Sequence, residues 1–201
     1  MPGTNAMHLW VGEKMRYLIC SDIHGSYTAC KKIIDQFISL KCDYLIILGD
    51  ILYHGPRNPL PEGHDPKSVA ELLNSHSDKI LACRGNCDSE VDQMVLDFPI
   101  MQDYSFIIDE GTRIFCTHGH LYTPEDTKLK YDFYFSGHTH VQGLTHIQGM
   151  ERNQSNTIIC NPGSASLPKA SSSAGFAVYE DNCVTLYDID GIKLKTMSYR
   201  E

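Results

Sequence analysis

Five segments of this 201-residue sequence end in the same way, with a short apolar run followed within a few residues by Asp, Asn or His. The five endings are Asp22-Ile23-His24-Gly25, Gly49-Asp50, Gly85-Asn86-Cys87-Asp88, Thr117-His118-Gly119-His120 and Gly137-His138-Thr139-His140. Short apolar runs are typical of buried strands, and the carboxyl ends of strands in an α/β sheet form the edge where ligands bind. We therefore expect these polar side chains to meet at one edge of a β structure.

In two of the endings, metal-ligand residues alternate with other residues. In an extended chain, side chains two residues apart point to the same side. Asp22 and His24 would then face one site, and the same alternation would aim His138 and His140 in one direction. Each ending alone is equally compatible with an ordinary turn or with histidines in an exposed loop. Five such endings in one chain are hard to explain in that way.

The order of the predicted elements indicates an α/β protein. Strands at residues 16–21, 43–48 and 79–83 alternate with helices at residues 26–40 and 66–76. The second half is mostly strand, at residues 105–109, 112–117, 133–136, 157–160, 176–179, 183–187 and 193–199, with hairpin turns at Glu110-Gly111 and Asp181-Asn182. This order predicts a two-sheet β-sandwich flanked by helices, in a four-layer arrangement.

Composition narrows the classes of function. No segment approaches the roughly 20 apolar residues of a membrane helix, and residues 1–14 lack the apolar run of a secretory signal. We read residues 1–14 as a flexible extension and residues 15–201 as a single domain. The eight cysteines include no CxxC pair, which argues against a zinc ribbon. We expect them to be reduced thiols in the cytoplasm. A net charge of -8 without a basic run argues against a stable nucleic-acid partner.

The side-chain types point to a metal site. His, Asp and Asn together suit a divalent metal such as manganese, iron, zinc or nickel. Two such cations about 3.5–4 Å apart suit an in-line displacement at phosphorus.

In this order, the motifs D-x-H, G-D, G-N-x-D, H-G-H and G-H-x-H resemble those of the calcineurin-like metallophosphoesterases, from about residue 15 to the end of the chain. The resemblance implies a phosphodiesterase with two divalent metal ions, of which Mn²⁺ is favoured and Fe, Zn or Ni stay open. It implies one metal held by Asp22, His24, Asp50 and His140. The second metal would be held by Asp50, Asn86, His118 and His138, so that Asp50 bridges the two.

The resemblance also implies catalytic roles for Asp50, Asn86, His118 and His120, although His120 is not a ligand in the usual pattern. Cys87 stands where many members have a histidine that protonates the leaving oxygen, and a thiol suits that task poorly. The leaving group would then depend on metal, water, His54 or His120. The candidates for substrate contacts are His54, Arg57, Asn58, Arg84 and Cys87.

The mechanistic hypothesis is attack on phosphorus by a hydroxide that bridges the two metals. Two divalent cations, two carboxylates and one hydroxide leave one net positive charge, which suits a singly charged small phosphodiester and also attracts a monoester dianion. The alternatives are a phosphomonoesterase or nuclease of the same superfamily, or a non-catalytic protein-binding scaffold like the retromer subunit of this fold. We expect no membrane partner, and a homo-oligomer stays open because relatives commonly form one.

Overall fold

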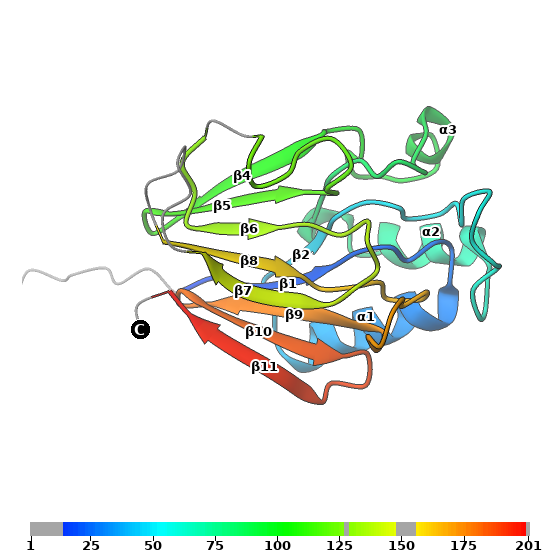
Figure 1. The fold of residues 1–201 in the computed structure, drawn as a ribbon. Coiled ribbons are helices and arrows are strands. Elements are labelled where there is room, and N and C mark those ends of the chain that lie inside the picture. The colour runs from blue at the N-terminus through cyan, green and yellow to red at the C-terminus, as the bar shows by residue number, and fades with distance from the viewer. Residues whose placement is uncertain (1–13, 127–128, 148–155, 200–201) are drawn as a thin grey trace, which may run out of the picture.

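Two mixed β-sheets pack face to face and form the body of the protein (Figure 1). The structure is a computed structural model that describes residues 14–126, 129–147 and 156–199. The six-stranded sheet has the order β11-β10-β9-β1-β2-β3, and the five-stranded sheet has the order β4-β5-β6-β8-β7. The strands are β1 (Arg16–Cys20), β2 (Tyr44–Ile47), β3 (Ile80–Ala82), β4 (Tyr104–Asp109), β5 (Thr112–Thr117), β6 (Phe133–Phe135), β7 (Gly143–Ile147), β8 (Thr157–Asn161), β9 (Gly175–Glu180), β10 (Cys183–Asp188) and β11 (Lys193–Ser198).

Helices α1 (Tyr27–Ser39) and α2 (Pro66–Asn74) cover the outer face of the six-stranded sheet (Figure 1). Each begins at a residue that satisfies the free N–H groups of the first turn. Ser26 Oγ accepts from the Ala29 amide, and the Asp65 carboxylate accepts from the Ser68 amide. The sequence therefore fixes both helix starts by local hydrogen bonding as well as by the apolar face.

Alternation along β1 divides the interior into two cores. Leu18 and Cys20 pack against the helices, whereas Tyr17 and Ile19 pack against the other sheet. On the outer face of the five-stranded sheet, Phe115, Tyr131 and Tyr134 form a third cluster, which is covered by residues of the β5–β6 loop. The predicted two-sheet sandwich is confirmed. Among the described residues, the helices α1 and α2 flank only the six-stranded sheet, so the predicted four-layer arrangement lacks a helical layer on the five-stranded sheet.

The parallel strands give the site its position. β1, β2 and β3 are parallel neighbours in one sheet, and β5, β6 and β8 are parallel neighbours in the other. Their carboxyl ends therefore lie at one edge of each sheet. The hairpins predicted at Glu110-Gly111 and Asp181-Asn182 are both present as antiparallel pairs.

Two elements were not predicted from the sequence. Strand β7 is an edge strand whose segment GLTHI contains a glycine and few apolar residues, so it carries a weak strand signal. Helix α3 (Glu90–Gln93) is too short to show a helical period, although Ser89 and Asp92 form a capping box at its start. Residues 1–13 of the predicted extension lie outside the described residues. Every described helix is too short or too polar to cross a membrane.

Candidate metal centre

The polar strand endings meet in the space between the two sheets. Asp22, His24 and Asp50 come from the six-stranded sheet, and His118 and His140 come from the five-stranded sheet. All five residues are at most 2% exposed. Burial of so many ionisable groups in one place is costly unless they bind a charge or one another.

Short backbone bonds hold the endings in register. The His24 amide donates to the Asp50 carbonyl at 2.9 Å, and the Gly137 amide donates to the His118 carbonyl at 2.9 Å. Across the two sheets, the His138 amide donates to Asp22 Oδ2 at 3.0 Å. The predicted meeting of the strand ends is thus present, and Asp22 links the two sheets.

The backbone at these positions is left-handed. Asp22, His24, Asp50, His138 and His140 have φ values of 55°, 51°, 55°, 66° and 60°. The extended geometry that we expected for the Asp22–His24 and His138–His140 pairs is therefore wrong. Left-handed φ values at residues with a side chain cost on the order of 1–3 kcal/mol each and concentrate at functional sites. Strain at five such positions in one cluster indicates that their side-chain positions matter for function.

The first group of donors consists of Asp22, His24 and His140. Their ligand atoms all lie within 4.8 Å of one another. Asp22 Oδ1 lies 3.2 Å from His140 Nε2 and 3.6 Å from His24 Nε2. His24 Nδ1 donates to the Tyr53 carbonyl at 2.9 Å, and His140 Nδ1 donates to the Leu167 carbonyl at 2.6 Å. Because a carbonyl only accepts, Nδ1 carries the proton in both rings and Nε2 faces the cluster.

This first group fits a cation. The two Nε2 atoms of His24 and His140 lie 3.2 Å apart, so two lone pairs would face each other in the neutral rings. The buried Asp22 Oδ1 accepts no hydrogen bond from any described residue. Buried oxygen atoms are rarely left without a partner. A divalent cation among these three atoms would satisfy the carboxylate and both lone pairs, and imidazole and carboxylate are suitable ligands for it.

The second group gathers around Asp50. Asp50 Oδ2 lies 3.5 Å from His118 Nε2 and 3.7 Å from His24 Nε2, which places this oxygen between the two groups. His118 Nδ1 donates to the Leu48 carbonyl at 2.7 Å, and its Nε2 lies 3.1 Å from Asn86 Oδ1. The His138 ring lies beside His118, with ring centroids 5.1 Å apart. The structure therefore brings all seven predicted ligands to one place.

The electrostatics of the cluster follow from burial and neighbouring charge. Burial raises the pKa of Asp22, but the adjacent imidazoles of His140 and His24 outweigh it, and its pKa lies below the usual value. Burial lowers the pKa of His24, whereas contact with Asp22 raises it. The net result is a pKa that is higher than usual. For His120 and His138, burial and the neighbouring His118 both act to lower the pKa.

Two further residues support the centre. The buried Asp88 carboxylate accepts from the amides of Asp50, Ile51 and Gly85 at 2.8, 2.8 and 2.7 Å, and so fixes the backbone that carries Asp50. The helix α3 that follows is capped by Ser89, so the Asp88 carboxylate stays free for these three amides. From the β8–β9 loop, Ser164 Oγ donates to the Asp22 carbonyl at 2.7 Å.

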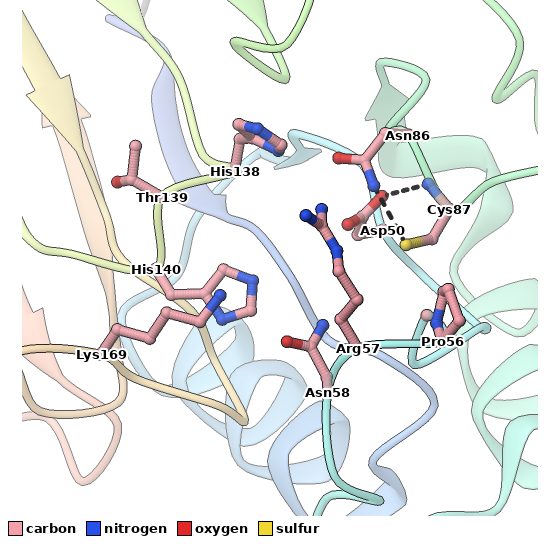
Figure 2. A pocket seen from close by; sticks show the side chains of 11 residues that line it. Asp50, Pro56, Arg57, Asn58, Asn86, Cys87, His138, Thr139, His140 and Lys169 are labelled. Carbon is pink, nitrogen blue, oxygen red and sulfur yellow. Dashed lines mark hydrogen bonds between the residues drawn. The ribbon is translucent and has the colours of Figure 1, made fainter.

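A pocket of about 440 Å³ opens over the donors (Figure 2). Arg57 and Asn58 line it on one side, and Lys169 lines it on the side of His140 (Figure 2). Cys87 also lines the pocket, and its Sγ lies within 4.8 Å of the ligand atoms of His24 and Asp50. Lys169 was missed because it stands in a loop that carries no motif.

The remaining predicted residues lie elsewhere. Arg84 forms an ion pair with Asp103 at 3.0 Å, and His54 packs against His64 with ring centroids 5.4 Å apart. Neither Arg84 nor His54 is among the described residues that line this pocket. The His120 ring packs against His118 at 5.2 Å, which places it beside the ligands as expected.

Comparison with known proteins gives consistent matches. The calcineurin-like phosphoesterase superfamily domain matches residues 15–182. The chain is 40% identical over 174 residues to phosphodiesterase YfcE of Escherichia coli, covering 86% of this chain and 91% of that protein. A solved structure of YfcE, described as a phosphoesterase from E. coli, superimposes with a TM-score of 0.83 at 36% identity, covering 92% of this chain and all of that one. Vps29 from Entamoeba histolytica, solved with Zn²⁺, shares the fold at 16% identity and a TM-score of 0.60, covering 92% of this chain and 100% of that one.

Proposed function

This chain belongs to the calcineurin-like phosphoesterase superfamily and is a metal-dependent phosphoesterase, and we propose that it hydrolyses a phosphodiester at a centre for two divalent metal ions. The observation that carries the proposal is the position of Asp50 Oδ2 between His24 Nε2 and His118 Nε2. A carboxylate in that position can contribute to two neighbouring cation sites at once. The identity to a named phosphodiesterase supports the diester as substrate.

The proposed ligand sets follow the two donor groups. Asp22, His24, Asp50 and His140 would hold one metal, and Asp50, Asn86, His118 and His138 would hold the other. Bound divalent cations would supply Lewis acidity to the phosphoryl group and an activated water, and Mn²⁺ is the favoured ion. The chain's own contribution is to fix the imidazole tautomers through backbone carbonyls and to exclude water from the donor atoms. We further propose that Asp50, Asn86, His118 and His120 act directly in the reaction.

Two cationic side chains support the binding of an anion. Arg57 and Lys169 line the pocket, and Figure 2 shows the Arg57 guanidinium extending into it. Among the described residues, Arg57 has no carboxylate partner, whereas Arg16, Arg84 and Arg113 each pair with one. An unpaired guanidinium beside a metal centre suits a phosphate oxygen. We propose that Arg57 and Lys169 contact the phosphoryl group, with Asn58 holding the Arg57 loop through its bond to the His54 carbonyl.

The remaining proposals concern the cellular setting. We propose that residues 15–201 act as one domain, because the family match spans residues 15–182 and both cores share strand β1. The eight cysteines are free thiols, which favours the reducing cytoplasm. A net charge of -8 favours a small substrate over a nucleic-acid partner. The homo-oligomer stays a prediction.

A panel of phosphoesters tests the proposal. Bis(4-nitrophenyl) phosphate, 4-nitrophenyl phosphate, and single- and double-stranded DNA are incubated with the protein in Mn²⁺, Fe²⁺, Zn²⁺ and Ni²⁺. We expect kcat/KM to be highest for the diester, and Asp50→Asn to lower it by roughly 10³-fold, because the metals supply several kcal/mol of transition-state stabilisation.

Asp35→Asn is the matched control, because Asp35 carries an exposed carboxylate that pairs only with Lys31 on the surface of α1. It should leave kcat/KM unchanged. Far better hydrolysis of the monoester or of DNA would overturn the diester assignment. A protein that binds no transition metal and hydrolyses none of these esters would instead be a scaffold.

A further inference from the structure

Two further hollows adjoin the pocket at the metal centre. A middle hollow of about 670 Å³ shares Arg57 and Cys87 with that pocket as lining residues. An end hollow of about 650 Å³ shares Tyr53 and Val91 with the middle hollow. We call these three parts together the substrate groove, and the last part the apolar compartment.

The apolar compartment is lined mainly by hydrocarbon. Its wall residues with apolar side chains are Leu52, Pro66, Ala70, Val91 and Val95, from the β2 loop, helix α2 and the α3 region. Val91 and Val95 remain 69% and 51% exposed. A concave apolar surface beside a reactive centre gains free energy when a ligand covers it.

Two histidines give this compartment a polar edge. The rings of His54 and His64 stand nearly perpendicular, at 88°. His54 Nδ1 and His64 Nε2 are both buried, and neither has a hydrogen-bond partner among the described residues. Buried nitrogen atoms without partners are uncommon in folded proteins. His54 and His64 line the compartment, so a flat ligand ring would pack against their imidazoles, and the Tyr53 ring, 4.9 Å from His54, offers a further aromatic surface.

Charge is distributed unevenly along the substrate groove. The cations Arg57 and Lys169 stand at the metal end. Asp88, Ser89 and Asp92 line the middle hollow, where carboxylates repel a phosphate and accept hydrogen bonds from hydroxyl groups. The groove therefore changes from anion-binding to polar to apolar along its length.

We propose that the substrate groove binds one ester group of the phosphodiester, and that this group consists of a polar spacer ending in a flat ring, as in a nucleoside. The inference rests on the proposed function, since it places the phosphate at the metal centre. It adds a substrate class to that function. The phosphate, the spacer and the ring would occupy the three parts of the groove in that order.

Kinetics with a constant leaving group test this inference. The 4-nitrophenyl esters of methyl phosphate, glycerol phosphate and thymidine 5′-phosphate differ only in the second ester group. We expect kcat/KM for the thymidine ester to exceed that for the methyl ester about tenfold, which corresponds to burial of roughly 55 Å² of apolar surface at about 25 cal/mol per Å². The glycerol ester, which has the spacer without the ring, should stay near the methyl ester.

Val95→Asn makes the compartment polar without adding charge and lies outside the metal centre. It should reduce the thymidine preference severalfold and leave the methyl ester unchanged. Ile108→Asn is the matched control, since Ile108 is 68% exposed on β4 and is not among the residues that line the groove. It should change neither value. Equal kcat/KM for all three esters, or an equal loss for all three in Val95→Asn, would overturn the inference while leaving the proposed function intact.

A binding measurement separates this inference from catalysis. Thymidine 5′-monophosphate or methyl phosphate is added to Zn²⁺-loaded protein, and the side-chain signals of His54 and His64 are followed by nuclear magnetic resonance. A ring in the compartment shifts both signals, so we expect shifts with the thymidine compound only. Identical shifts with methyl phosphate, or none with either, would count against the groove even if no ester were hydrolysed.

Discussion

Asp22 and Asp132 are both buried aspartates, yet their surroundings differ. Asp132 directly precedes β6, at the end of the sandwich opposite the metal centre, and Asp22 directly follows β1. Asp132 accepts from the Arg113 guanidinium at 2.8 and 3.0 Å, from the Arg113 amide at 2.9 Å and from Tyr199 Oη at 2.9 Å. Asp22 has one oxygen with no hydrogen-bond donor among the described residues.

The difference shows what each end of the sandwich is built for. For Asp132, burial raises the pKa but the Arg113 guanidinium outweighs it, so the pKa is lower than usual. At Asp132 the partner is an arginine, which is always charged, so the pair is complete within the protein. At Asp22 the partners are imidazoles whose lone pairs also lack a donor, so the group is complete only with an added cation. The Asp132 end contributes to stability, whereas the Asp22 end is arranged to bind a cation.

Asp22→Asn should produce the largest effect on activity and a small effect on the metal-free fold. Loss of a ligand charge should lower kcat/KM roughly 10³-fold, because metal binding supplies several kcal/mol. The new amide can donate to the lone pair at His140 Nε2, so the metal-free variant should melt within about 3 °C of the metal-free parent. Steady-state kinetics and metal-free thermal unfolding measure the two quantities.

A large loss of metal-free stability in Asp22→Asn would show that Asp22 is structural and would remove the contrast with Asp132. Retained metal content with retained activity would remove Asp22 from the ligand set. Metal content per chain, measured by elemental analysis, distinguishes these results.

Asp132→Asn should lower the stability of the fold and leave the activity almost unchanged. The amide has one accepting oxygen where the carboxylate has two. Either the pair of donors on Oδ2 (the Arg113 amide and Nε) or the pair on Oδ1 (Arg113 Nη2 and Tyr199 Oη) therefore loses its acceptor, and the half-buried arginine loses its charge partner. We expect a loss of roughly 2–4 kcal/mol in the free energy of unfolding. At a temperature where the variant is folded, kcat/KM should stay within about twofold. A matching fall in kcat/KM would mean that the two ends are coupled.

The sequence predicted the metal end better than the pocket around it. The meeting of these polar side chains could be predicted because each follows a short apolar strand, and parallel strands bring such ends together. Their assignment as metal ligands came from the family resemblance and stays a prediction. The local geometry could not be predicted. The sequence pattern predicted an extended backbone at Asp22 and His24, but the backbone there is left-handed. Tertiary hydrogen bonds, such as the bond from the His138 amide to Asp22, stabilise this conformation.

The roles of Lys169 and Asp88 were missed for a different reason. Lys169 reaches the pocket from the β8–β9 loop, and Asp88 acts by accepting three backbone amides, which no spacing in the sequence reveals. His54 was a candidate for the leaving group and for substrate contacts, but the loop carries it out of the pocket at the metal centre and into the apolar compartment. Positions that depend on how a long loop folds require the tertiary structure.

Acid unfolding offers the smallest and most specific test of the Asp132 end. The pKa of Asp132 in the folded protein lies below its unfolded value of about 3.9. Its contribution to stability is therefore fully present above that unfolded value and is lost as the pH falls through the folded pKa. Urea unfolding at pH 6 and at pH 3 should show a larger stability gap between the parent and Asp132→Asn at pH 6. Carboxylates shared by both proteins, Asp22 among them, cancel in the difference, so an unchanged gap would mean that the Arg113 pair contributes no charge-dependent stability.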